Sequence, residues 1–142
     1  MKIKKSLKNK RILYIGLDYY RIPKEISLEL TRLGAECLFY PIKKKNLWVS
    51  FCNRVSKNRF KKIQINHHNK ILSETKDLFF DYIFFIQVHQ ISHNMMNKYK
   101  NQFKDSKFIL YNWDSIKQHN YLSHIKYFDD VYSFVLIFTI QI

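Results

Sequence analysis

The sequence predicts an α/β fold with an open, parallel, Rossmann-like sheet of about five strands and helices on both faces. Short apolar runs without helical periodicity alternate with segments whose apolar residues recur at helical spacing, the order typical of a parallel sheet. The chain has 142 residues, of which 46% are hydrophobic and 25% charged, so it can bury one core but is too short for two ordinary domains. No internal repeat and no linker rich in glycine, serine or proline divides it.

The first strand, helix and second strand follow a basic, flexible arm over residues 1–10, which is rich in lysine and poor in core-forming side chains. RILYIG at 11–16 is an apolar run that ends at a glycine, as expected for a buried parallel strand entering a loop. Pro23 lies where a helix can begin, and Gly34 ends a segment whose apolar residues have helical spacing. Residues 35–40 predict a second strand, which completes a right-handed β-α-β unit.

The rest of the chain continues the alternation. The third strand is an almost unbroken run of β-branched and aromatic residues bounded by polar ones, and Ser92 is the expected N-cap of the helix after it. Because the first, third and fourth strands are the most apolar, we expect them to be central and nearly fully buried. The predicted elements are one or two helices within 43–76, a strand at 81–86, a helix at 92–103, a strand at 107–111, a turn or short helix at 121–125 and a strand at 131–134.

The chain is strongly basic, with a formal net charge of +14. Residues 38–73 contain no Asp or Glu and interleave Lys and Arg with Trp48, Phe51 and Phe60. A nucleic-acid surface has this composition, and so does a helix that rests on an anionic membrane. A solvated helix that packs its aromatic side chains inward has it as well, so three interpretations remain open.

The localisation expected from the sequence is cytoplasmic, with peripheral contact at the inner face of the membrane. The apolar run at 12–17 is shorter than the core of a signal peptide, and the uncharged run at 131–142 is about half as long as a membrane-spanning helix. Cys37 and Cys52 have no framework of further cysteines, so we expect reduced thiols.

Several chemistries lack the residues that they need. Two glycines cannot form a GxGxxG dinucleotide loop or a GxxxxGK[ST] phosphate loop. A phosphate-receiver domain suits the alternation but needs an Asp at the tip of the third strand, where Gln87 stands, so this interpretation is set aside. His67 and His68 are adjacent and cannot share one helical face as zinc ligands, so we expect them at the surface. Asp129-Asp130 is interpreted as a turn, and no metal site is predicted.

Ligands of open parallel sheets bind beyond the carboxyl ends of the strands. Gly16 serves either a tight turn or the close approach of a ligand, and Asp114 either caps a helix or contacts a ligand. Trp113 either packs in the core or stacks on a sugar ring or base, and His89 is either a general base or merely solvated. No catalytic residue is assigned. The candidate ligand-binding residues are Gly16, Asp18, Gln87, His89, Trp113, Asp114 and Ser115.

Residues 111–134 read YNWDSIKQHNYLSHIKYFDDVYSF. The WDS and YFDDVYSF segments, with RILYIGLDYY, DYIFFIQ and KFILYNWDS in the same order, resemble bacterial glycosyltransferase-like proteins of lipopolysaccharide and capsular polysaccharide biosynthesis, related to the spore-maturation glycosyltransferase-like group. The resemblance covers residues 11–134. It implies the N-terminal, acceptor-side Rossmann-like domain of a two-domain, GT-B-type transferase.

The same resemblance implies partners and an activity. The expected partner is a saccharide or lipid-linked saccharide acceptor, and the nucleotide-sugar donor would bind to the missing C-terminal half, so this chain itself holds no cofactor. The apolar tail at 135–142 departs from the family and is interpreted as a truncation or frameshift remnant. We therefore expect no sugar transfer by this chain alone. The alternative function is a non-enzymatic basic module that binds nucleic acid or an anionic membrane surface.

Overall fold

The computed structural model describes residues 6–114 and 120–133. Strands and helices alternate as the sequence predicts, and the region at 43–76 contains two helices. The elements are β1 (Arg11–Gly16), α1 (Ile22–Arg32), β2 (Glu36–Pro41), α2 (Leu47–Val55), α3 (Lys57–Thr75), β3 (Tyr82–Ile86), α4 (His93–Gln102), β4 (Lys107–Asn112), the 3₁₀ helix η1 (Leu122–Tyr127) and β5 (Asp130–Ser133).

The five strands form one parallel sheet in the order β2-β1-β3-β4-β5. The three strands expected at the centre are therefore central. The chain moves outward from β1 to β2 and then crosses back to β3 on the other side of β1, so the strand order reverses between β1 and β3. Because all strands are parallel, the residues that follow β1, β3 and β4 lie at one edge of the sheet, which confirms the predicted placement of Gly16, Gln87 and Trp113.

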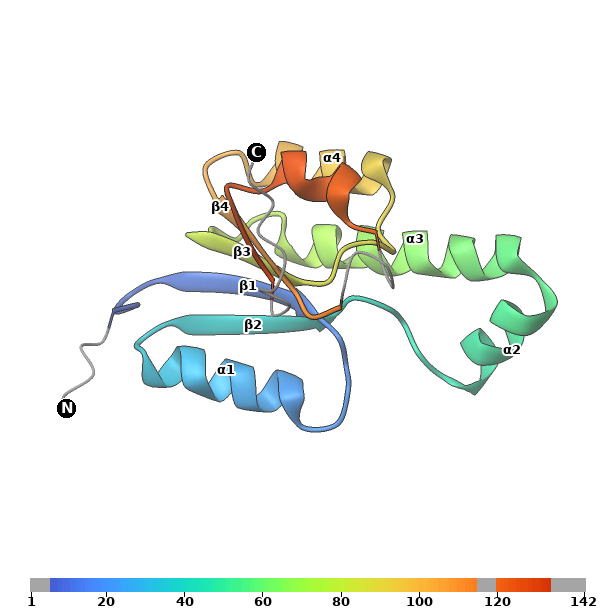
Figure 1. The fold of residues 1–142 in the computed structure, drawn as a ribbon, viewed down its shortest axis with the longest axis horizontal. Helices are drawn as coiled ribbons and strands as arrows, with labels where there is room; N and C mark the ends of the chain where they lie inside the picture. The colour runs from blue at the N-terminus through green and yellow to red at the C-terminus, as the bar shows by residue number, and fades with distance from the viewer. Residues whose placement is uncertain (1–5, 115–119, 134–142) are drawn as a thin grey trace.

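Helices cover the two faces unequally, with α1 on one face and α3 and α4 on the other (Figure 1). The predicted N-cap is confirmed, because Ser92 Oγ accepts a hydrogen bond from the backbone N of Met95 at 3.2 Å. Gly34 follows α1 with φ +104°, and a Cβ atom there would lie 2.9 Å from Cα of Lys8. A glycine is therefore required at this turn.

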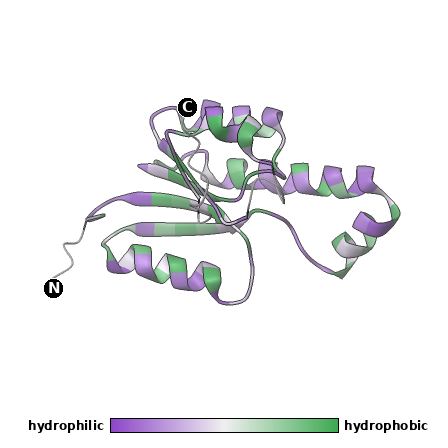
Figure 2. Ribbon diagram, in the orientation of Figure 1, coloured by the Kyte–Doolittle hydropathy of each residue, from purple (hydrophilic) through white to green (hydrophobic). Residues whose placement is uncertain are grey.

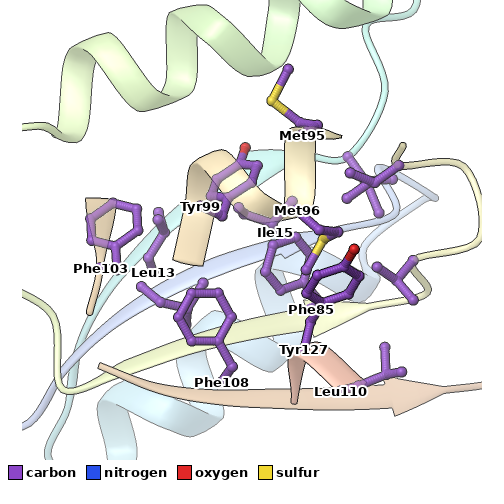
Figure 3. Close-up of a cluster of buried hydrophobic side chains, with 14 of the residues drawn as sticks. Leu13, Ile15, Phe85, Met95, Met96, Tyr99, Phe103, Phe108, Leu110 and Tyr127 are labelled. Atoms are coloured by element: carbon purple, nitrogen blue, oxygen red, sulfur yellow. The ribbon is translucent and has the colours of Figure 1, made fainter. Parts of the chain in front are cut away.

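The main core fills the space between the sheet and α3, α4 and η1 (Figure 3). Phe85 of β3 lies at its centre, edge-on to Tyr99 at 5.5 Å between ring centroids and stacked with Phe108 at 6.4 Å. Burial of one such side chain contributes roughly 1.5–3 kcal/mol. Figure 2 shows α3 mostly in purple, because only one stripe of this long helix reaches the core.

The opposite face of the sheet is apolar but only partly covered. Within the described part of the chain, α1 is the one helix on that side, and a groove of about 210 Å³ runs beside it over β3, β4 and β5. The expectation of nearly full burial therefore holds for β1 and for the core face of β3 and β4, whereas most residues of β3 and β4 on this face are only half-buried. We call this the apolar groove; it is lined by Leu7, Ile12, Leu30, Tyr82, Phe84, Ile109, Tyr111 and Tyr132.

Two aspartates join the starts of neighbouring strands. Asp81 accepts a hydrogen bond at 2.8 Å from the backbone N of Arg11, and Asp129 accepts one at 2.7 Å from the backbone N of Phe108. Asp130 begins β5 and pairs with Lys107 at 2.6 Å. The interpretation of Asp129-Asp130 as a simple turn is therefore incomplete, because both side chains attach β5 to β4.

The ends of the chain are described in part. Leu7 and Asn9, in the expected arm, donate backbone hydrogen bonds to Leu33 O at 3.0 Å and Gly34 O at 3.2 Å. The tail at 135–142 lies outside the described residues, and the domain boundaries stay a prediction. No helix in the described ranges has the length and hydrophobicity to cross a membrane.

Candidate functional site

Gln87 and Asp114 are brought together at the carboxyl edge of the sheet. The Gln87 side chain is buried, and its Nε2 atom donates a hydrogen bond to the Asp114 carboxylate. Its backbone N donates to Tyr111 O at 3.1 Å, which fixes the loop after β3 to β4. Gln87 has φ +62°, a left-handed conformation that residues other than glycine rarely adopt. Such strained backbone is frequent at functional positions.

Gly16 is the last residue of β1. A glycine is needed there because the ring of Tyr14 occupies the space that a side chain would fill. A Cβ atom on Gly16 would lie 2.5 Å from Cε2 of Tyr14. The ring is fully buried beside Phe39 and Phe84, at centroid distances of 4.9 and 5.4 Å, so it cannot move aside cheaply. The sequence leaves a tight turn and ligand approach open for this glycine, and the structure shows a packing reason for it; the ligand role stays a prediction.

The other predicted residues are distributed more widely. Trp113 is half-buried, and His89 Nε2 lies 3.1 Å from Gln90 Nε2. Asp18 is exposed and lines a separate cavity. Ser115 lies outside the described residues. A ligand role for these positions stays a prediction. Within residues 6–114 and 120–133, no group of three or more His, Cys, Asp or Glu could hold a metal ion.

The separate cavity is basic, has a volume of about 460 Å³ and lies beyond the ends of β1 and β2. The basic segment was predictable from the sequence but this site was not, because its residues come from two loops and from α3. The signal was the run of three lysines directly after the second predicted strand. We call this cavity the lysine cavity; it is lined by Asp18, Pro41, Lys43, Lys44, Lys45, Ile63, Asn66, His67 and Lys70.

The loop that carries the three lysines is fixed to α3 by Gln64. Backbone N of Lys44 donates to Gln64 Oε1 at 2.9 Å, and Gln64 Nε2 donates to Lys44 O at 3.1 Å. The side-chain amide thus satisfies both backbone groups of one loop residue, which would otherwise depend on water.

The two histidines fix the same loop one turn further along α3. His67 Nε2 donates to Pro41 O at 2.6 Å, and His68 Nε2 donates to Ile42 O at 2.8 Å. His68 Nδ1 accepts from the Tyr99 hydroxyl at 2.8 Å. The prediction that both histidines lie at the surface is wrong for His68, which is 5% exposed. Its burial lowers the pKa of His68 to about 4.

Helix α2 presents aromatic and aliphatic side chains to solvent. Val49 and Cys52 are buried, whereas Trp48 and Phe51 are 58% and 54% exposed and stack at 5.7 Å between centroids. The interpretation that the aromatic side chains of this segment pack inward is therefore wrong for α2. We call this exposed face the α2 surface; it consists of Leu47, Trp48, Phe51 and Val55.

Comparison with known proteins gives a fold likeness. No protein-family model and no curated protein matches the sequence. A response regulator from Burkholderia pseudomallei, solved with a phosphorylated aspartic acid, a calcium ion and citrate, is 13% identical over 89% of this chain and 61% of its own, with a TM-score of 0.56. The response regulator TrrA from Thermotoga maritima, solved in complex with Mg²⁺-BeF, is 17% identical over 92% of this chain and 90% of its own, with a TM-score of 0.53.

The fold is of the response-regulator type. The chain spans less than two thirds of the Burkholderia protein and nearly all of the Thermotoga one. The receiver-type fold was set aside because Gln87 replaces the required Asp, and that step was wrong for the fold, since one side chain at a strand tip does not decide the sheet. The coarse prediction of a five-stranded parallel α/β sheet is confirmed.

The glycosyltransferase resemblance is wrong, and so are the polysaccharide function and the saccharide partners derived from it; the GT-B assignment has no support. The alternative of nucleic-acid or membrane binding gains no support either. The physical reason lies in the segments that carried the resemblance. Tyr127 packs in the core, Asp129 joins β5 to β4, and Asp114 accepts from Gln87. These residues build a parallel sheet, which unrelated enzymes and signalling proteins share.

Proposed function

We propose that this chain is a receiver-like signalling module that binds a protein partner through the α2 surface and does not accept a phosphoryl group. The fold likeness supports the class of module. The exposed aromatic side chains of α2 carry the proposal, because contiguous exposed apolar side chains mark interaction sites. Cytoplasmic localisation remains part of this proposal.

Gln87 supports the absence of phosphoryl transfer. The structural neighbour from Burkholderia carries a phosphorylated aspartic acid. In this chain the tip of β3 is an amide, whose oxygen is a poor nucleophile, and Gln87 Nε2 is engaged by Asp114. Gln87 therefore cannot take the place of a phosphorylated aspartate, and we expect the signal to be carried by non-covalent contact.

The charge around the α2 surface identifies the kind of partner. Residues 38–73 contain nine Lys and Arg and no acidic residue. Arg54 lies on α2, and Lys57 and Arg59 begin α3 directly after it, all of them exposed. An acidic protein segment with its own apolar face satisfies both features, because its apolar side chains cover Trp48 and Phe51 while its carboxylates meet the surrounding cations.

A pair of synthetic helical peptides tests this surface. Both present the same leucine and phenylalanine face, and one carries Glu and the other Lys on its polar face. We expect the acidic peptide to bind about tenfold more tightly than the basic one, measured by calorimetry at near-physiological salt. The double variant W48A/F51A should lose this binding, because aromatic anchors supply most of the energy of such contacts.

The matched control is L28A/F79A, which removes two apolar side chains of similar exposure, 54% and 56%, away from α2. This variant should bind the acidic peptide like the native chain. Equal loss in both double variants, or equal binding of the two peptides, would contradict the proposal. After incubation with acetyl phosphate and Mg²⁺, mass spectrometry should show no added phosphoryl group on the chain. A covalent phosphoryl adduct would refute the proposal that the chain does not accept a phosphoryl group.

A further inference from the structure

We propose that the lysine cavity binds a small molecule that carries a phosphate or diphosphate group. This inference does not rest on the α2 surface. The cavity is bounded by the loop after β1, the loop after β2 and one face of α3, so it lies at the edge where ligands of open parallel sheets bind.

The cavity wall is held in place before any ligand arrives. Three backbone positions at the end of β2 and in the loop after it are hydrogen-bonded to side chains of α3: Pro41 to His67, Ile42 to His68, and Lys44 to Gln64. The loop therefore presents Lys43 and Lys45 from a fixed backbone. A preorganised site loses less entropy when it binds than a mobile lysine-rich loop would.

The charges in the cavity are not balanced by the protein. Four lysines line it, and Asp18 is the one carboxylate among the lining residues. Lys70 forms an ion pair with Glu74 at 3.7 Å. The pKa of Lys43, in contrast, is lowered by burial and by the neighbouring charge of Lys45. An anion between these lysines would relieve their mutual repulsion. A phosphate group suits this role because its several oxygens accept hydrogen bonds from more than one ammonium group.

The size of the cavity indicates more than a bare ion. A volume of about 460 Å³ lies within the range of pockets that hold small organic ligands. Asn66 adds an amide that can donate or accept, and Ile63 adds an apolar wall. We therefore expect a phosphorylated organic molecule to use the site more fully than inorganic phosphate does.

The test compares two double variants that remove the same charge. K45Q/K70Q changes two lysines that line the cavity, and K61Q/K62Q changes two exposed lysines of α3 that do not. Binding of inorganic phosphate, pyrophosphate and ADP is measured by NMR shift titration at near-physiological salt, with melting temperatures recorded to confirm folding. Lys43 is left in place because it is half-buried.

We expect the native chain to bind pyrophosphate and ADP, with the shifts centred on residues 41–45 and 63–70. K45Q/K70Q should weaken this binding about tenfold, K61Q/K62Q should leave it unchanged, and Asp18→Asn should strengthen it. Tighter binding of ADP than of pyrophosphate would assign the organic part to the cavity, and equal binding would assign the phosphates alone; both support the proposal. Equal weakening by the two double variants, or no saturable binding, would overturn it.

Discussion

His68 shows how one buried side chain ties three elements together. It lies on α3, donates to the loop after β2 and accepts from Tyr99 on α4. Both bonds require the neutral ring with its proton on Nε2, since a protonated Nδ1 could not accept from the Tyr99 hydroxyl. The folded state therefore disfavours the charged form of this histidine.

This preference for the neutral ring predicts that stability falls as the pH is lowered. The pKa of His68 is about 4 in the folded chain and about 6.5 in the unfolded one, so the unfolded chain binds the extra proton between these values. The free energy of unfolding should fall by roughly 3 kcal/mol from this group between pH 6.5 and 4. Urea unfolding at a series of pH values measures it.

The variant H68Q supplies the comparison, because its amide can donate and accept but does not titrate. It should be less stable than the native chain at pH 7 and should lose less stability on acidification. Some loss remains in both chains, since burial also lowers the pKa of His124. Parallel pH profiles would contradict the role assigned to His68.

The sequence predicted the strand-tip residues well and the buried polar ones poorly. Gly16, Gln87 and Trp113 lie at one edge as expected, because the direction of parallel strands fixes where their ends lie. The burial of His68 was not predicted, because adjacent histidines were interpreted only as possible zinc ligands. His68 precedes Ile71 and Leu72 by three and four residues, so it lies on the buried stripe of the helix, a signal that was present in the sequence.

At the scale of elements, α3 organises the basic edge of the molecule. Gln64, His67 and His68 have the spacing that places side chains on one helical face, and each holds the loop after β2. One face of a single helix thus determines the path of the loop that leads into α2.

Replacing Gln64 by Ala should loosen this loop without unfolding the domain. The two hydrogen bonds to Lys44 would be lost, and the half-exposed site would take up water, so we expect a loss of about 0.5–1.5 kcal/mol. Hydrogen exchange should show faster exchange of the Lys44 amide and little change in β1 or β3. The control is Gln102→Ala on α4, which removes a side-chain amide that donates to Leu72 O of α3 at 2.9 Å, away from the loop. This variant should leave the Lys44 amide protected.

The elements were predictable because their signals are local. β1, β3 and β4 are built around apolar runs, and Ser92 and Gly34 mark the ends of helices through their own chemistry. The short segment after β4 was more ambiguous, since η1 has little helical periodicity and its buried residues, His124 and Tyr127, face a core that is formed by other elements.

At the scale of the whole molecule, the sheet is covered unequally. The core face carries α3, α4 and η1, while the apolar groove on the other face has only α1 beside it in the described ranges. Local signals could not reveal this, nor could they distinguish a receiver-type sheet from a transferase half, because strand order depends on contacts between distant segments. The choice between families therefore went wrong although the elements were right.

We expect the exposed apolar groove to promote self-association, and a substitution of Tyr132, which lines it, tests this. Tyr132 is 55% exposed on β5, at the edge of the sheet. We expect Tyr132→Lys to change the free energy of unfolding by less than about 1 kcal/mol and to reduce light scattering at high protein concentration, because a charge on an edge strand opposes pairing. Tyr19→Lys adds the same charge at a residue of similar exposure away from the groove. An equal reduction by that control would show that net charge alone is responsible.

The distribution of the tryptophans has an optical consequence. The chain has two, Trp48 on the α2 surface and Trp113 at the carboxyl edge of the sheet, whereas the main core is built from Phe, Tyr and aliphatic side chains. Tryptophan emission therefore reports the α2 surface and the carboxyl edge of the sheet, and reports little of the core. The single-tryptophan variants W48F and W113F would separate these surfaces spectroscopically, each providing an intrinsic probe of one of them.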